Sequence, residues 1–118
     1  MKLKDRGLVK VKFYLSNSGR SPVEEFLTEL HKDLKADFLD AVILLEQGQN
    51  LSMPLSRNLS SIAKGLHELR LKDSTGAYRF VYFIKKAEGI YFVHAFKKKT
   101  QELPEKEINL VLKRLREI

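Results

Sequence analysis

Apolar and polar residues alternate near the start of the chain, a pattern typical of a strand with one buried face. In residues 9–15, valines alternate with lysines over the first four positions, and the last three residues are Phe13, Tyr14 and Leu15. A cluster of turn-forming residues, 16–19, follows directly. The pattern predicts a β-strand over residues 9–15 that ends in a turn.

Two helices are predicted between residues 21 and 48. Ser21 fits an N-cap, Pro22 fits the first helical position, and Glu24 completes a capping box. We expect Asp33 to cap a second helix, which ends before Gly48. The short join predicts an antiparallel helical hairpin. Apolar residues at helical spacing form its two stripes: Val23, Phe26, Leu27, Leu30 and Leu34, then Phe38, Val42 and Leu45.

The second half of the chain predicts three strands and a helix. The strand-like runs are Leu66–Leu71, Tyr78–Lys85 and Ile90–Phe96, and the short glycine-containing connections between them indicate an antiparallel meander. Residues 49–65 have weak periodicity and are interpreted as a loop, with room for a helical turn near 58–63. Pro104 opens the last helix, whose apolar stripe is Ile108, Val111, Leu112 and Leu115.

The predicted fold class is α+β, with the element order β-α-α-β-β-β-α. We expect a mainly antiparallel four-stranded sheet in which the first strand lies beside the meander and the helices cover one face. No repeat or linker interrupts the chain, so residues 1–118 are interpreted as a single domain.

Composition narrows the classes of function. Hydrophobic residues make up 43% and charged residues 31% of the chain, which is typical of a globular protein in water. The absence of cysteine excludes disulfides, thiolate catalysis and cysteine-ligated metals. No apolar run approaches the roughly 20 residues that a membrane helix needs, and the charged N-terminus has no apolar segment of a secretion signal after it. We therefore expect a cytoplasmic protein without a membrane partner.

The net charge of +7 is concentrated in one part of the chain. Residues 64–99 hold nine basic and three acidic side chains. Such a surface indicates a partner that carries phosphates or acidic side chains, and the alternative is a basic face that contacts only water.

Strand parity marks Arg79 as a candidate site residue. Arg79 shares a strand face with Val81 and Phe83, so we expect it to be partly buried and held, which suits a phosphate clamp. The alternative is an ion pair with Glu68. Arg70 and a lysine of the pair Lys97 and Lys98 are expected on the same sheet face, where the cations would hold an anion and stabilise charge that develops on a phosphate. Crowded like charges would also lower the pKa of a lysine.

The other candidate side chains are assigned either to the core or to the proposed site. The same parity puts His94 on a face with Ile90 and Phe92, which favours a core histidine. Tyr91 lies on the opposite face, where it stacks a base or packs against its neighbours. The sequence contains none of the common nucleotide, metalloprotease or hydrolase motifs, and its histidines are scattered: His31, His67 and His94. We expect no metal and no cofactor.

Three segments resemble a known family. They are residues 65–70, residues 76–82 and residues 94–101 followed by Pro104, and their order and spacing are similar to the phage-derived Gp49-like, HigB-like branch of the RelE/ParE toxin superfamily. The opening at 21–27 and the middle segment, residues 45–59, fit the same family, so the resemblance covers nearly the whole chain.

The resemblance implies a RelE-like fold and the toxin of a type II toxin–antitoxin system. Such a toxin cleaves mRNA on the ribosome without a metal and is neutralised by a cognate antitoxin, often of helix-turn-helix type, in a hetero-oligomer. By similarity Arg79 and Lys97 or Lys98 stabilise the phosphorane, and a lysine or Glu68 deprotonates the 2′-hydroxyl. The implied site residues are Arg70, Arg79, Lys97 and Lys98 for catalysis and Lys64, Lys72, Tyr91 and Lys99 for RNA binding.

The chain departs from the family pattern at its end. Residues 103–118 contain neither the tyrosine nor the histidine that many relatives use as a proton donor, which leaves the acid unassigned and allows a member with weak or lost nuclease activity. Two other functions stay open: a ParE-like inhibitor of DNA gyrase with the same fold, and a non-enzymatic basic binding module. The basic residues 97–99 at the end of the last strand favour RNA.

Overall fold

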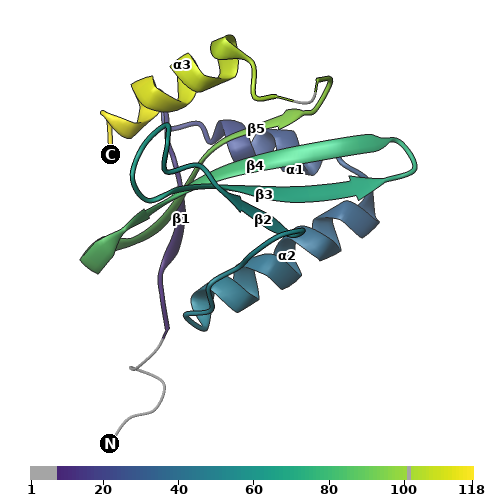
Figure 1. Ribbon diagram of the computed structural model, residues 1–118, viewed down its shortest axis with the longest axis horizontal. Coiled ribbons are helices and arrows are strands. Elements are labelled where there is room, and N and C mark those ends of the chain that lie inside the picture. The colour runs from purple at the N-terminus through teal and green to yellow at the C-terminus, as the bar shows by residue number, and fades with distance from the viewer. Residues whose placement is uncertain (1–7, 101) are drawn as a thin grey trace, which may run out of the picture.

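The computed structural model describes residues 8–100 and 102–118, so the prediction about a secretion signal falls largely outside the described residues. Five strands form one sheet in the order β1-β5-β4-β3-β2, with helices on both faces (Figure 1). The elements are β1 (Val11–Phe13), α1 (Pro22–Thr28), α2 (Lys32–Glu46), β2 (Ser56–Asn58), β3 (Leu66–Asp73), β4 (Gly76–Lys85), a 3-10 helix (Lys86–Glu88), β5 (Gly89–Lys97) and α3 (Glu105–Leu115).

The α+β class and the antiparallel meander of β3, β4 and β5 are confirmed. Strand β1 lies beside β5 as predicted, but it pairs in parallel and is shorter than residues 9–15. The prediction of a four-stranded sheet is wrong, because the sheet has a fifth strand. This strand, β2, lies inside the segment interpreted as a loop and pairs with β3. Strand β2 consists of three residues without an apolar alternation, so no periodicity marks it.

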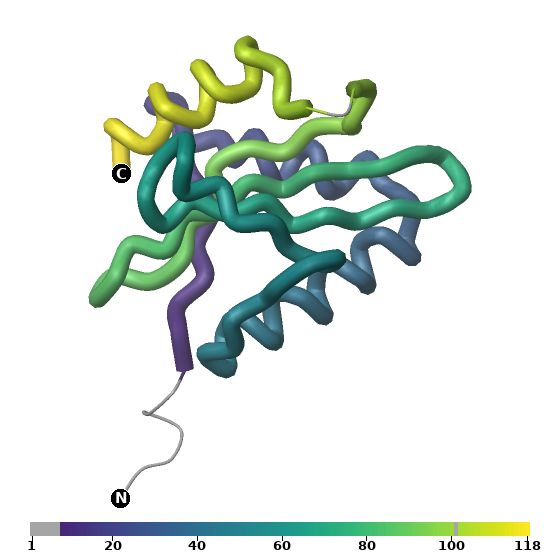
Figure 2. The backbone as a smooth tube through the Cα atoms, viewed as in Figure 1, coloured from purple at the N-terminus to yellow at the C-terminus, as the bar shows by residue number. Residues whose placement is uncertain are grey.

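The predicted N-cap residue is confirmed for α1 but not for α2. The backbone N–H of Glu24 donates to Ser21 Oγ at 3.2 Å, which confirms the predicted cap of α1. The prediction that Asp33 caps α2 is wrong: His31 holds that position, and Asp33 lies in the first turn, where a negative charge complements the helix dipole. The two helices diverge from their junction instead of pairing as a hairpin (Figure 2), because each buries its stripe on the sheet, α1 against β5 and α2 against β3.

The sheet has a core on each face. The first face lies against α1 and α2, and its buried residues include Leu34, Phe38, Phe80, Tyr82 and Phe92. The second face lies against α3, and its buried residues are Tyr14, Leu59, Leu66, Val81, Val93 and Val111. The prediction that all helices cover one face is therefore wrong for α3. An amphipathic stripe shows that a helix is buried on one side, but it does not say against which face of a sheet.

A β-bulge interrupts β5. Val81 of β4 lies opposite His94 and Tyr82 lies opposite Phe92, which leaves Val93 as an extra residue. An extra residue reverses the alternation of side chains beyond it. The prediction that His94 shares a face with Ile90 and Phe92 is wrong for this reason. Beyond the bulge, the second face receives His94, Phe96 and Lys98.

Candidate functional site

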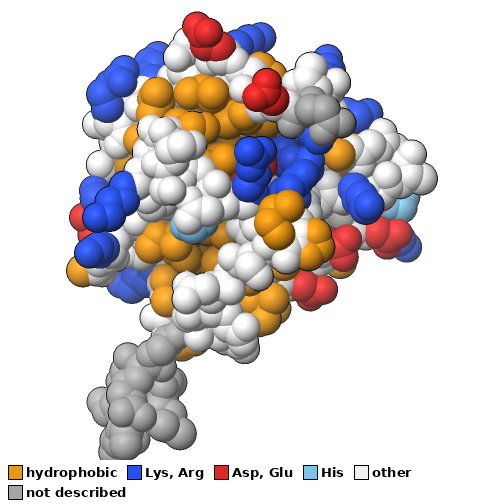
Figure 3. Space-filling model, in the orientation of Figure 1, with side chains coloured by type: hydrophobic (Ala, Val, Ile, Leu, Met, Phe, Trp, Pro, Cys, Tyr) orange, Lys and Arg blue, Asp and Glu red, His pale blue; other side chains and the backbone are white. Residues whose placement is uncertain are grey.

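Four cationic side chains gather on the second face, around the carboxylate of Glu68. We call Arg57, Arg70, Arg79 and Lys98 the basic cluster; all four line one depression, together with Glu68, Phe96, Thr100, Glu102 and Leu103. Figure 3 shows Lys and Arg side chains gathered near the middle of that view. The free volume inside the depression is about 10 Å³, so it offers a surface to a ligand rather than a deep pocket.

The strand register places these side chains in rows. Arg70 lies opposite Arg79, and Arg79 lies opposite Phe96, so one row crosses β3, β4 and β5. Arg57 of β2 lies opposite Glu68 of β3 in the next row. Because neighbouring strands are about 4.8 Å apart, the row of Arg70 and Arg79 brings two like charges close together. Two carboxylates, Glu68 and Glu102, face four cations in this depression.

Arg79 is the buried member of the basic cluster, with 5% of its surface exposed. Its Nε lies 3.5 Å from Glu68 Oε1, and its Nη1 donates to the carbonyl oxygen of Tyr78 at 3.3 Å. Burial lowers the pKa of Arg79, the charge of Glu68 opposes that shift, and Arg70 and Arg57 add to it. The predicted burial of Arg79 and the alternative of an ion pair with Glu68 are thus both present.

Arg70 is half-buried and lines a neighbouring pocket as well as the depression. Its Nη1 donates to Met53 Sδ at 3.2 Å. The pocket has a volume of about 420 Å³ and is lined by Met53, Pro54, Leu55, Lys72 and both arginines of the row. Lys72, which was predicted to contact RNA, therefore lies next to the basic cluster.

The two adjacent lysines at the end of β5 point to opposite faces. Lys98 lines the depression with Arg79, as predicted. Lys97 lies on the first face, with its Nζ 5.8 Å from the centre of the Tyr78 ring. Of the two lysines that the sequence left as alternatives, Lys98 therefore lies on the face of Arg79 and Lys97 does not. The bulge at Val93 causes the difference. Lys97 also covers Gly76, where a β-carbon would come within 2.7 Å of Lys97 Cε.

The remaining predicted RNA contacts are spread over the molecule. Tyr91 pairs with Phe83, four residues along β4 from Arg79, which corresponds to roughly 13 Å. Its hydroxyl accepts a hydrogen bond from Lys12 Nζ at 3.4 Å. Lys64 is exposed in the turn before β3, and Lys99 is exposed just after Lys98. Tyr91 and Lys64 are thus not part of the basic cluster.

Arg57 is the site residue that the sequence interpretation missed. It is exposed and lies in β2, within the segment interpreted as a loop. The sequence holds no periodic signal for it, because β2 is only Ser56–Asn58 and the leucines on either side, Leu55 and Leu59, pack into the cores of opposite faces. Three positions are too few to separate a strand from a loop.

A second polar group lies under α3, beside the basic cluster. We call His94, Glu107 and Arg114 the histidine cluster. His94 Nε2 lies 2.6 Å from Glu107 Oε1, and Arg114 Nη1 lies 3.2 Å from His94 Nδ1 and donates to the Val93 carbonyl at 2.8 Å. A neutral imidazole that donates from Nε2 and accepts at Nδ1 satisfies both neighbours. Burial lowers the pKa of His94 in agreement with that state, so the histidine cluster ties α3 to β5.

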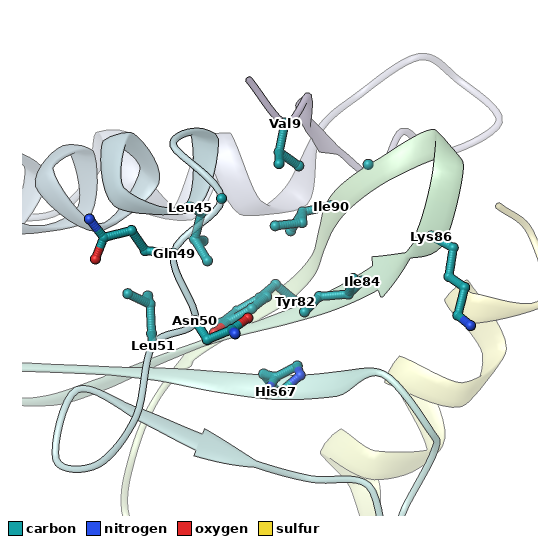
Figure 4. A pocket seen from close by; sticks show the side chains of 12 residues that line it. Val9, Leu45, Gln49, Asn50, Leu51, His67, Tyr82, Ile84, Lys86 and Ile90 are labelled. Atoms are coloured by element: carbon teal, nitrogen blue, oxygen red, sulfur yellow. The ribbon is translucent and has the colours of Figure 1, made fainter. Parts of the chain in front are cut away.

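An apolar pocket of about 230 Å³ opens on the first face, between the end of α2 and the sheet (Figure 4). His67 lines it and stacks on Tyr82, with ring centres 5.2 Å apart. Burial lowers the pKa of His67. Lys86 lies at the rim and extends away from the pocket in Figure 4. Gln49 and Asn50 supply further polar side chains to its lining.

Residues 8–100 and 102–118 contain no group of three or more histidine, aspartate or glutamate side chains placed to hold a metal ion. Over the same ranges, no helix combines the length and the apolar character that crossing a bilayer requires.

Comparison with known proteins gives one family. The family model described as phage derived protein Gp49-like (DUF891) matches residues 25–116, well over half of the chain. A search of curated proteins found no match. The matched residues include the whole of the basic cluster and of the histidine cluster.

Proposed function

The chain belongs to the family of phage-derived Gp49-like proteins, and from this premise we propose that it is the toxin of a type II toxin–antitoxin system. Its proposed activity is the metal-independent cleavage of mRNA on the ribosome. The observation that carries the proposal is the basic cluster: four cations, from β2, β3, β4 and the residue after β5, face one depression. Such an arrangement favours a phosphate whose negative charge increases during the reaction.

The proposed reaction uses the RNA itself as the nucleophile. The 2′-oxygen attacks the adjacent phosphorus, the bond to the 5′-oxygen breaks, and the products are a 2′,3′-cyclic phosphate and a 5′-hydroxyl. The proton of the 2′-hydroxyl leaves to a base, and the departing 5′-oxygen takes up a proton. In the phosphorane the non-bridging oxygens carry the extra charge, and Arg79, Arg70 and Lys98 would stabilise it by charge-assisted hydrogen bonds.

Glu68 fits the role of a positioning residue. Its carboxylate is buried beside the Arg79 guanidinium, 3.5 Å from Nε, which fixes the direction of that side chain. A carboxylate in this contact is poorly placed to accept a proton from RNA. The half-buried Lys98 and the exposed Glu102 line the same depression, and we propose them for the proton transfers.

The proposal includes the partners of such a toxin. They are mRNA, the ribosome and a cognate antitoxin. We propose that the antitoxin forms a hetero-oligomer with this chain and that all of them meet in the cytoplasm. The same excess of cations that suits a phosphate also suits an acidic segment of an antitoxin.

The two adjacent lysines give the sharpest test. We expect induced wild-type protein in a bacterium to arrest protein synthesis within minutes and to produce new mRNA 5′ ends inside translated frames. Lys98→Ala should reduce this cleavage at least tenfold, whereas Lys97→Ala, on the other face, should leave it unchanged. Arg79→Lys keeps the charge beside Glu68 but removes the guanidinium fork, and it should reduce cleavage about a hundredfold.

Intact mRNA in cells that stop growing would refute the nuclease activity. Gyrase-linked DNA breaks under those conditions would identify a ParE-like inhibitor. Growth without any effect, together with RNA binding that survives Arg79→Lys, would identify a binding module.

A further inference from the structure

We propose that Phe96 is a stacking platform for one base of single-stranded RNA, next to the phosphate bound by the basic cluster. The inference rests on the proposed function and adds to it a base-binding subsite. Phe96 is half-buried and lines the same depression as Arg79 and Lys98.

The register places the ring beside the arginines. Phe96 lies directly opposite Arg79, and Arg79 lies directly opposite Arg70, so the three side chains form one row across β3, β4 and β5. Each step in this row is one strand spacing, about 4.8 Å. A nucleotide whose phosphate lies at the two arginines therefore has an aromatic surface one step away, within the span of its own sugar and base.

The Phe96 ring packs against a neighbouring side chain that is itself fixed. Its neighbour His94 stacks on it with ring centres 5.4 Å apart and an angle of 24° between the planes. Glu107 and Arg114 fix the imidazole from both of its nitrogens. A ring that is fixed before binding loses little conformational freedom when a base stacks on it. The histidine cluster thus supports the proposed subsite without touching RNA.

The combination of ring and cations selects the class of ligand. Aromatic rings beside cationic side chains bind unpaired bases and their backbone, whereas the bases of a duplex are already stacked. Tyr91, the aromatic residue that the sequence suggested for stacking, lies about four residues along the sheet from Arg79, and Lys12 Nζ lies 5.2 Å from its ring centre. Tyr91 is therefore the matched control for Phe96.

The test uses abasic RNA. We would measure the affinity of short 2′-O-methyl RNA, which cannot be cleaved, by fluorescence anisotropy, with an abasic site moved through each position in turn. For wild-type protein we expect one position at which loss of the base weakens binding about tenfold. Phe96→Leu should bind the intact RNA about tenfold more weakly and show no further loss at that position. Tyr91→Leu should keep the full tenfold loss.

A second readout does not depend on removing the ring. The chain has no tryptophan, so Phe96→Trp and Tyr91→Trp are single-tryptophan proteins. RNA should quench the fluorescence of Phe96→Trp, much less so when the RNA is abasic at the identified position, and should leave Tyr91→Trp nearly unchanged. Circular dichroism of each variant checks that it is folded.

The outcomes separate the subsite from the activity. An abasic loss that persists in Phe96→Leu, or unquenched Phe96→Trp in bound complexes, overturns the subsite while cleavage in cells still stands. Wild-type protein that neither binds RNA nor cleaves mRNA overturns both proposals.

Discussion

The histidine cluster and the basic cluster lie side by side on one face of the sheet, and they differ in how their charges are matched. In the histidine cluster, Glu107 and Arg114 each contact His94, and Arg114 also donates to a backbone carbonyl. In the basic cluster, Arg57, Arg70, Arg79 and Lys98 share a depression with only two carboxylates. Strand β5 supplies His94 to the first, and Lys98 of the second follows directly after the same strand.

The helix α3 accounts for the difference. Where it covers the sheet, water is excluded, and a polar side chain without a partner would cost free energy. Beyond it Arg57 is exposed and Arg70 and Lys98 are half-buried, so water reaches most of the positive charge, while Arg79 stays buried against Glu68. The surplus of positive charge still opposes folding, since Arg70 and Arg79 lie directly opposite each other. A charge arrangement that opposes folding is typical of a binding site, whereas one that is fully matched is typical of structural support.

The largest effect is expected where the basic cluster is buried. Arg79→Ala leaves the Glu68 carboxylate buried without its cation, so we expect the free energy of unfolding to fall by about 3 kcal/mol in urea denaturation. Arg70→Ala removes a half-buried charge from the same row and should change the free energy of unfolding by less than about 1 kcal/mol. Equal losses in the two variants would contradict the difference in burial.

Breaking the histidine cluster should come next. His94→Ala removes the partner of Glu107 and Arg114 and leaves a cavity under α3, so the free energy of unfolding should fall by about 2 kcal/mol. His67→Ala is the control: it removes a ring from the rim of an open pocket and should cost about half as much. Thermal and urea unfolding measure both, and a larger loss for His67→Ala would show that the histidine cluster does not hold α3.

A smaller effect is expected on RNA binding from single cations. Arg57→Ala and Lys98→Ala should each weaken the binding of single-stranded RNA by roughly fivefold and reduce the salt dependence of the affinity by about 0.7 in log–log slope. Lys97→Ala should have little influence on either quantity, because Lys97 lies on the other face. Titrations at several salt concentrations test this, and equal slopes for all three variants would mean that RNA does not distinguish the faces.

The smallest effect concerns pH. Burial holds the pKa of His94 and of His67 below the ordinary value of 6.5, so the unfolded chain binds more protons than the folded chain as the pH falls through that value. Stability should therefore decrease below about pH 6.5. His94→Gln should flatten this dependence in urea denaturation at a series of pH values. A steeper dependence in the variant would mean that the folded state favours the imidazolium.

Local chemistry was sufficient to predict much of the fold. The cap at Ser21, the three strands of the meander and the start of α3 after Pro104 all follow from neighbouring residues, and they are confirmed. The prediction that Arg79 is buried and held followed from its apolar neighbours. These features are determined over a few positions of the chain, which is the range that periodicity and capping describe.

What the sequence could not supply depends on contacts between distant segments. Strand β2 exists because β3 offers it a free edge, and Arg57 joins the basic cluster only through that pairing. The side of the sheet that α3 covers depends on the path of the whole chain, and the apolar stripe of the helix does not indicate it. The bulge at Val93 lies within an unbroken run of strand-forming residues, so the alternation gave no sign that Lys98 rather than Lys97 would meet Arg79.

The bulge also changes how mutations at the end of β5 should be understood. A one-residue slip of the strand exchanges the faces of its last side chains, and such slips arise whenever a residue is inserted or deleted. Residues 97–99 are all lysines, so either alignment of the strand presents a lysine to the arginines. The repeated residue makes the positive charge at this position robust to evolutionary changes in strand length, even though only one of the lysines occupies it at a time.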